Sequence, residues 1–223
     1  MGCSLSGREG TREFKASLHD AACALIDAGN QGFSTAKKVI SALESNPYEV
    51  PRISPRTFAA NRYFGQAMGS ASSGPAAIVR LAAALQRLEP SLQWYRRGGD
   101  CYAESSFLEG HANALIIGPT GLVSLPNIVV GVSLLAPHIA YPAHQHPPEE
   151  LYFVLSPGQW RQNDGDWWEP GVGGVVYNPS NVRHAMRSGT WPLLAIWCLL
   201  SPASPSVGGR RKGIVNDLGG DVE

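Results

Sequence analysis

Apolar residues recur at three- and four-residue steps between about residues 11 and 90 of the chain. That spacing places them on one face of an α-helix, and it predicts helices that pack through that face. The clearest example runs from Ala76 to Leu88, directly after the turn signal Gly74-Pro75. Ser34 predicts the N-cap of a helix over residues 35–43, and Ser54-Pro55 predicts the start of another. The first apolar stripe consists of Phe14, Leu18, Ala22, Leu25 and Ile26.

From Trp94 onward the pattern changes to short apolar runs separated by Gly, Pro, Asn and Asp. Short runs between such breakers are typical of β-strands. Asn163-Asp164-Gly165-Asp166 predicts a hairpin turn between residues 159–162 and residues 167–168. So many short strands in one part of the chain favour a β-sandwich or a jelly-roll barrel. The expected strands are residues 114–117, 128–135, 151–155, 174–177 and 193–199.

The two patterns divide the chain into three parts. We expect residues 1–90 to form a helical region that packs on the barrel, and residues 91–201 to form the barrel itself. Residues 202–223 are rich in Gly, Ser and charged residues, and we expect them to be a loosely ordered tail. The predicted fold class is therefore mainly β, with an N-terminal α-helical region.

Composition narrows the range of partners. The 18 Lys and Arg residues balance the 18 Asp and Glu residues, and no basic stripe indicates a nucleic acid or an anionic membrane. No apolar run approaches the roughly 18 residues of a transmembrane helix. Residues 1–6 fit a short N-myristoylation pattern, which we interpret as a chance match. The four cysteines, which lack metal-type spacing, are Cys3, Cys23, Cys101 and Cys198. Unpaired thiols suit a reducing compartment, so we expect a cytoplasmic protein. A homodimer is left open.

The strongest chemical signal is a cluster of metal-ligand residue types. His144 and His146 are two residues apart, so on a strand they share one face. Glu150 follows after the turn signal Pro147-Pro148, and His184 returns from a later strand. Imidazoles with one carboxylate suit Fe(II), Zn(II), Mn(II) or Ni(II), and they leave positions open for a substrate. The sequence thus predicts one divalent transition metal, with Zn, Fe(II) and Mn as the leading candidates.

These residues resemble the two cupin motifs, a resemblance that implies a cupin jelly-roll β-barrel. The ligand positions of the two motifs are occupied by His144, His146, Glu150 and His184. His138 stands where the first motif begins with Gly, and Gly158 closes that motif one residue late. Asn181 replaces the Gly of the second motif, a mild change because Asn tolerates left-handed backbone, and Ser188 replaces its final Asn. The departures concern turn geometry rather than metal binding.

A longer set of segments resembles the cupin dimethylsulfoniopropionate (DMSP) lyases, in the form that has helices before the barrel. The resemblance covers residues 75 to 200 well and the helices loosely. Its distinguishing mark is Glu150-x-Tyr152 after His-x-His, a tyrosine that general cupin patterns do not demand. The resemblance implies cleavage of the substrate to dimethyl sulfide and acrylate with a divalent metal. The matching segments are residues 92–97, 110–114, 141–142, 146–152, 155–158, 165–167 and 184–188.

A β-elimination next to a carboxylate needs a metal that holds the carboxylate, a base for the α proton, and a pocket for the sulfonium. Tyr152 is the expected base, because a neighbouring divalent cation favours its phenolate. The resemblance places a second tyrosine at Tyr141, which orients the substrate or assists proton transfer. The expected metal ligands are His146, Glu150 and His184, with His144 or Tyr152 completing the shell.

Four further residues have a functional and a structural interpretation. Trp197 could face the sulfonium through a cation–π contact, but core packing is the favoured interpretation. His111 and His138 are interpreted as structural or surface histidines rather than ligands. Glu149 is interpreted as solvated or as a support for the site, because Glu150 has the ligand spacing.

Other functions remain open at this point. A different metal-dependent cupin enzyme, such as a dioxygenase or an isomerase, uses the same ligand types. A non-catalytic cupin that binds a small ligand would give Tyr152 no special role. A lyase with another substrate is also compatible. The Glu150-x-Tyr152 pair favours proton abstraction, and the resemblance to the lyases implies a small carboxylate substrate with a sulfonium group.

Overall fold

The N-terminal part of the chain is helical. The computed structural model describes residues 3–27, 32–48, 50, 54–98 and 104–200. The α-helices before the barrel are α1 (Cys3–Asp27), α2 (Phe33–Leu43), α3 (Phe64–Ala71) and α4 (Ala76–Leu88), and α5 (Ser105–Gly110) precedes the second strand. Two short 3-10 helices, η1 (Ala59–Tyr63) and η2 (Glu89–Ser91), connect them.

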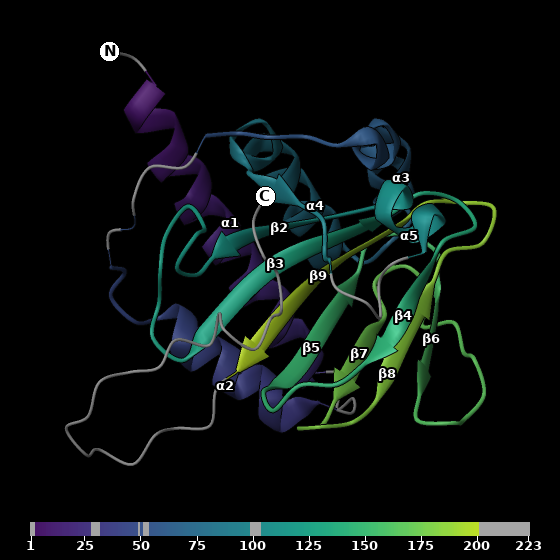
Figure 1. Cartoon of the computed structure of the whole chain (residues 1–223). Coiled ribbons are helices and arrows are strands. Elements are labelled where there is room, and N and C mark those ends of the chain that lie inside the picture. Colours follow the sequence, from purple (N-terminus) through teal and green to yellow (C-terminus); the bar gives the residue numbers. More distant parts are fainter. Residues whose placement is uncertain (1–2, 28–31, 49, 51–53, 99–103, 201–223) are drawn as a thin grey trace.

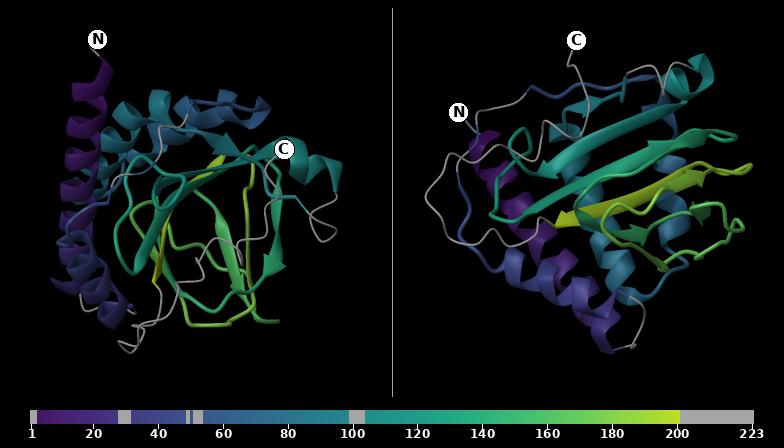
Figure 2. Two further views of the ribbon diagram at one scale, coloured as in Figure 1. Left: turned by 60° about the vertical axis from the view of Figure 1, so that its left-hand side comes forward. Right: turned by 60° about the horizontal axis from the view of Figure 1, so that its bottom comes forward.

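The rest of the described chain forms two antiparallel sheets. The larger sheet has the strand order β1-β2-β3-β9-β5-β7, and the smaller has the order β4-β8-β6. Figure 2 shows the two sheets closing around a common interior, with the helices on one side. This is the cupin-type barrel with an N-terminal helical region that the sequence predicts. The strands are β1 (Trp94–Tyr95), β2 (His111–Ile117), β3 (Ile128–Leu135), β4 (Ala140–His144), β5 (Glu149–Val154), β6 (Gln159–Gln162), β7 (Val175–Asn178), β8 (His184–Arg187) and β9 (Leu193–Leu200).

Strands β3 and β9 are buried along their whole length, which explains their nearly continuous apolar sequences. Successive side chains on β9 alternate between two apolar clusters. Leu194, Ile196 and Cys198 face the helices, whereas Ala195 and Trp197 face the barrel interior. The helix-facing side is therefore structural, and the interior side is left for a site.

The helices cover the outer face of the larger sheet, as Figures 1 and 2 show. Phe14 and Leu18 of α1, Leu81 of α4 and Val39 of α2 are fully buried in the same cluster as the outward side chains of the sheet. Polar contacts also join α2 to β5. Glu149 accepts hydrogen bonds from Thr35 (2.8 Å) and from Lys38 (2.6 Å). Glu149 therefore joins helix α2 to the barrel, and its hydrogen bonds do not support the predicted metal site, contrary to one of its sequence interpretations.

Several predicted elements differ from the structure. The helix expected from Ser54-Pro55 is wrong, because residues 54–58 are non-helical and Arg56 pairs with Gln93 beside β1. The helical turn begins only at Ala59. Ser34 is also not a cap, since it lies inside α2, whose N-cap is Gly32. The hairpin after β6 is present as a bridge between Trp160 and Trp168.

Some sequence interpretations lie partly outside the described residues. Residues 202–223, predicted as a tail, are among those outside, as are the side chain of Cys3 and residue Cys101. The Sγ atom of Cys23 lies 3.7 Å from Nδ1 of His19, and Cys198 is buried. Among the described residues, none of the helices is both long and apolar enough to span a bilayer.

We propose that the helical region and the barrel fold as one unit, and removal of residues 1–90 tests this. A chain that begins at Ser91 would expose the outward apolar side chains of the larger sheet, so we expect it to aggregate. The milder change Leu81→Ala leaves the chain intact and should lower the free energy of unfolding by about 2–5 kcal/mol. Solubility, size-exclusion chromatography and urea unfolding measure these effects. A soluble, cooperatively unfolding truncated chain would contradict the proposal.

Candidate metal centre

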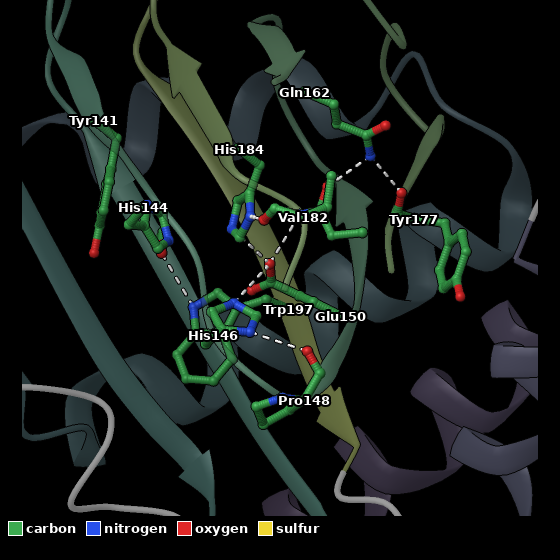
Figure 3. Close-up of polar contacts among 12 residues, drawn as sticks. Tyr141, His144, His146, Pro148, Glu150, Gln162, Tyr177, Val182, His184 and Trp197 are labelled. Atoms are coloured by element: carbon green, nitrogen blue, oxygen red, sulfur yellow. Dashed lines mark hydrogen bonds and ion pairs between the residues drawn. The ribbon is translucent and has the colours of Figure 1, made fainter. Parts of the chain in front are cut away.

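Three strand ends bring the predicted ligands together inside the barrel. His144 is the last residue of β4, and it pairs across the smaller sheet with His184, the first residue of β8. His146 follows two residues after β4, and Glu150 lies on β5 of the facing sheet. The ligand nitrogens of the three histidines lie within 4.8 Å of one another. Figure 3 shows His146 and His184 on either side of the Glu150 carboxylate.

Each imidazole is held in one orientation by a backbone carbonyl two residues away. The Nδ1 atom lies 2.9 Å from the Pro142 oxygen in His144, 3.0 Å from the Pro148 oxygen in His146, and 3.0 Å from the Val182 oxygen in His184. A carbonyl oxygen only accepts, so Nδ1 carries the proton in all three rings. The Nε2 lone pairs are therefore left for a metal ion.

The Glu150 carboxylate lies against two of these nitrogens. Its Oε2 is 3.1 Å from Nε2 of His184 and 3.4 Å from Nε2 of His146. The Nε2 atom of His184 is buried and makes no hydrogen bond. A nitrogen lone pair and a carboxylate oxygen repel each other in a buried site unless a proton or a cation lies between them. Three imidazole nitrogens with one carboxylate are also a donor set that Zn(II), Fe(II) and Mn(II) accept. The residues therefore fit a divalent metal.

Two side-chain amides, those of Asn178 and Gln162, hold the Glu150 carboxylate in place. Asn178 of β7 lies opposite Glu150 in the sheet register, and its Nδ2 donates to Oε2 of Glu150 at 2.9 Å. Gln162 of β6 in turn donates to Oδ1 of Asn178 at 2.8 Å and to the carbonyl of Tyr177 at 2.6 Å. Asn178 is completely buried, so both ends of its amide are satisfied by these hydrogen bonds. The arrangement orients one carboxylate oxygen toward the histidines.

The charges of the cluster follow from burial and from mutual contact. Burial lowers the pKa of the His144 imidazole to about 3, with a contribution from His184. Burial also opposes ionisation of Glu150, but the facing His146 and His184 hold its pKa well below its usual value. The Glu150 contact outweighs burial at His146 and raises its pKa. The carboxylate is thus ionised at neutral pH, and His144 is neutral.

Both predicted tyrosines line the same pocket as the cluster. Tyr152 and Tyr141 are nearly fully buried, and the Tyr141 hydroxyl lies 3.4 Å from Nη1 of Arg97. Burial, followed by the charge of Glu150, raises the pKa of the Tyr152 phenol well above its usual value. Burial also raises the pKa of Tyr141, and the charge of Arg97 opposes that rise. Proton transfer by Tyr152 therefore needs additional positive charge beside it.

Trp197 lines the pocket rather than only the core, so the packing interpretation is incomplete. An added Cβ at Gly131, its neighbour on β3, would lie 2.2 Å from Cζ2 of the indole. The indole Nε1 donates to Ser133 at 3.1 Å, and Ser133 donates to Asn113 at 2.6 Å. The missing side chain at Gly131 is what lets the indole lie against the sheet, and the two hydrogen bonds keep it there.

His111 and His138 are a structural and a surface residue, as the sequence suggests. His111 is completely buried and stacks on Phe107 with ring centroids 3.7 Å apart. Its Nδ1 donates to the Phe107 carbonyl, and its Nε2 accepts the backbone N–H of Arg97 at 2.8 Å. His138 is exposed and has φ 61°, which explains why the cupin motif has Gly at that position.

Asn181 shows how a second departure from the cupin motif is accommodated. It replaces a Gly and adopts φ 60°, the left-handed backbone that Asn tolerates. Its backbone N–H donates to the carbonyl of His146 at 2.9 Å, so it also helps to hold that segment. Ser188 replaces the final Asn of the motif and bonds to Ala136 and Ile139. The altered turns therefore keep the ligands in place.

Sequence reasoning assigned no role to several residues of the site. Arg97 and Asn113 lie in segments that resemble the lyases, but nothing in their spacing separates them from ordinary polar residues. Asn178 could have been singled out only by the register that places it opposite Glu150. Gln162 lies in a predicted strand without any charge or motif to mark it.

Comparison with known proteins gives consistent results. The family model for dimethylsulfoniopropionate lyase matches residues 32–195. DMSP lyase DddQ of Ruegeria pomeroyi is 28% identical over 116 residues, which are 52% of this chain and 55% of the relative. The aligned part thus spans about half the length of that relative.

Two sets of crystal structures are also similar. The crystal structure of DMSP lyase DddQ from Ruegeria pomeroyi superposes with a TM-score of 0.64 and 20% identity, over 91% of this chain and 95% of that one. A chain from the crystal structures of the DMSP lyases RdDddP and RnDddQII gives a TM-score of 0.69 and 19% identity, over 89% and 95%. At these identities the likeness shows a shared fold.

Replacement of a cluster histidine should remove the metal. We expect His184→Ala to lose most bound divalent metal, measured by elemental analysis after dialysis, whereas the exposed control His138→Ala keeps it. Asn178→Ala removes only the amide that orients Glu150 and should weaken metal affinity by about 10–100-fold. Full metal retention in His184→Ala would refute the assignment.

His111 should make folding stability depend on pH. Burial lowers its pKa from 6.5 to about 4. As the pH falls from 6.5 toward 4, the unfolded chain takes up a proton at this residue that the folded chain does not, so stability falls. The loss amounts to roughly 3 kcal/mol by pH 4. Urea unfolding at several pH values should give a shallower dependence for His111→Gln than for the native protein, whereas parallel curves would exclude this role.

Proposed function

The chain belongs to the dimethylsulfoniopropionate lyase family, and on that premise we propose that it cleaves dimethylsulfoniopropionate to dimethyl sulfide and acrylate. The observation that carries the proposal is the pocket that His144, His146 and Glu150 share with the two tyrosines. A β-elimination needs a group that binds the carboxylate and a base near the α carbon. Both kinds of group line this pocket.

His144, His146, Glu150 and His184 would hold the divalent metal. Bound there, the metal would supply positive charge that holds the substrate carboxylate, acidifies the adjacent C–H bond and favours the phenolate of Tyr152. The Nδ1 hydrogen bonds keep the imidazoles oriented before any ion arrives. Asn178 does the same for Glu150. The protein therefore needs little rearrangement to take up its metal.

Tyr152 takes the α proton of the substrate. The electrons of the C–H bond form the double bond of acrylate, and the C–S bond breaks with its electron pair on sulfur. Dimethyl sulfide therefore leaves as a neutral molecule, and the proton on Tyr152 returns to solvent. Tyr152 follows Glu150 by two residues on β5 and lines the same pocket, which supports this role.

The neighbouring strand β9, whose Trp197 pairs with Tyr152, suits the leaving group. Trp197 and Leu199 of β9 line the pocket with apolar and aromatic surface. A sulfonium cation is attracted to the face of an indole, and the neutral sulfide is compatible with an apolar wall. Tyr141 lies on the Arg97 side and would orient the carboxylate.

Headspace gas chromatography tests the proposal directly. Metal-loaded protein should release dimethyl sulfide from dimethylsulfoniopropionate, with acrylate in equal amount, at the same rate with and without oxygen. Strict oxygen dependence would indicate a dioxygenase instead. No turnover of any carboxylated onium compound would leave a small-molecule-binding cupin.

The role of Tyr152 can be separated from that of the metal. Tyr152→Phe keeps the ring and removes the hydroxyl, so we expect turnover to fall by at least about a hundredfold with metal still bound. KM should change less, since carboxylate binding persists. Tyr141→Phe, measured in parallel, should retain more activity. Near-native turnover in metal-replete Tyr152→Phe would transfer the base role away from this residue.

A further inference from the structure

Among the described residues that line the pocket, Arg97 supplies a guanidinium, and it lies two residues after the end of β1. Arg97 lines the pocket together with Tyr141, and its Nη1 is 3.4 Å from the Tyr141 hydroxyl. The guanidinium donates to the phenol oxygen, so this contact does not use the phenol proton. Arg97 and Tyr141 thus form a pair of hydrogen-bond donors beside the cluster.

Arg97 lines the same pocket as His144, Glu150 and Tyr152, so its positive charge lies beside the candidate metal ligands. The Glu150 carboxylate, by contrast, is directed at the histidines and at Asn178. A ligand that enters between Arg97 and the histidines therefore meets positive charge and donors. That environment selects an anionic group.

A hydrogen bond to His111 fixes the backbone of Arg97. Its N–H donates to Nε2 of His111, which is buried, stacked on Phe107 and bonded through Nδ1 to the Phe107 carbonyl. The low pKa of His111, about 4, keeps that nitrogen an acceptor at neutral pH. The preceding strand β1 is paired with β2. A long side chain with a fixed backbone loses less freedom when it binds a ligand.

We propose that Arg97, with the Tyr141 hydroxyl, binds the carboxylate of the substrate and thereby sets its direction in the pocket. A planar guanidinium matches the two oxygens of a carboxylate. Like charges repel, so the onium group of the substrate lies away from Arg97. The site therefore takes short zwitterions and rejects onium compounds that lack the carboxylate. The inference rests on the proposed function for the identity of the substrate.

A matched pair of neighbouring arginines makes the test sharp. Arg96 is exposed, donates to the Leu108 carbonyl at 3.1 Å and lies over the Phe58 ring. Arg96→Met and Arg97→Met remove the same charge one residue apart, but only Arg97 lines the pocket. Arg97→Lys keeps the charge and loses the planar fork. Elemental analysis and thermal unfolding first establish that the variants are folded and equally metal-loaded.

Calorimetric titration with acrylate and with its neutral isostere acrylamide then gives the result. We expect Arg97→Met to bind acrylate about 10- to 100-fold more weakly, with acrylamide binding unchanged, because a charged hydrogen bond is lost. The acrylate affinity of Arg97→Lys should lie between those of Arg97→Met and the native protein, and the acrylate affinity of Arg96→Met should equal the native value. With dimethylsulfoniopropionate, KM should rise more than kcat falls.

The outcomes separate this inference from the proposed function. Arg97-dependent acrylate binding without release of dimethyl sulfide would support a carboxylate site and refute the lyase reaction. Dimethyl sulfide release with unchanged acrylate affinity and unchanged KM in Arg97→Met would refute the role of Arg97 and keep the reaction. Equal losses of acrylate and acrylamide binding would also overturn it, since they indicate a general packing defect.

Discussion

The hydrogen bonds from three imidazole Nδ1 atoms to nearby carbonyls are the interaction on which the site depends. Each carbonyl lies two residues away from its histidine, in the chain segments around Pro142, Pro148 and Val182. Local backbone therefore decides which nitrogen carries the proton, before any distant contact is made. The barrel adds only proximity, because the pairing of β4 with β8 and the position of β5 bring the oriented rings to one place.

The helical region and the site belong to opposite faces of the same sheet. The helices α1, α2 and α4 bury the outer face of the sheet, so the apolar side chains on that face supply much of the core. The interior face can therefore carry polar groups beside its apolar ones. Glu149 and Glu150 show the division most sharply. They are neighbours in the chain, yet Glu149 binds the helix residues Thr35 and Lys38 while Glu150 binds inside the barrel.

Local sequence patterns could predict most of the fold, but cross-strand partners could not be predicted. The apolar runs identify β3 and β9 because residues buried on both faces leave an unbroken signal, and the spacing from His144 to Glu150 identifies the cluster. Ser54-Pro55 misled because pairing beside β1 overrides a local helix signal there. Asn178 acts on the site because the strand register places it opposite Glu150, and the backbone of Arg97 is fixed by its hydrogen bond to His111. No local sequence pattern encodes either contact.

Gly131 and Trp197 illustrate how such hidden partners constrain change. The indole occupies the space in which a side chain at position 131 would lie, so the two positions share a single volume. A larger side chain at position 131 therefore requires a smaller one at position 197, because the space does not hold two large side chains. Related sequences should therefore show the two positions varying together, although they lie sixty-six residues apart in the chain. Covariation between them would record the shape of the pocket in sequence data alone.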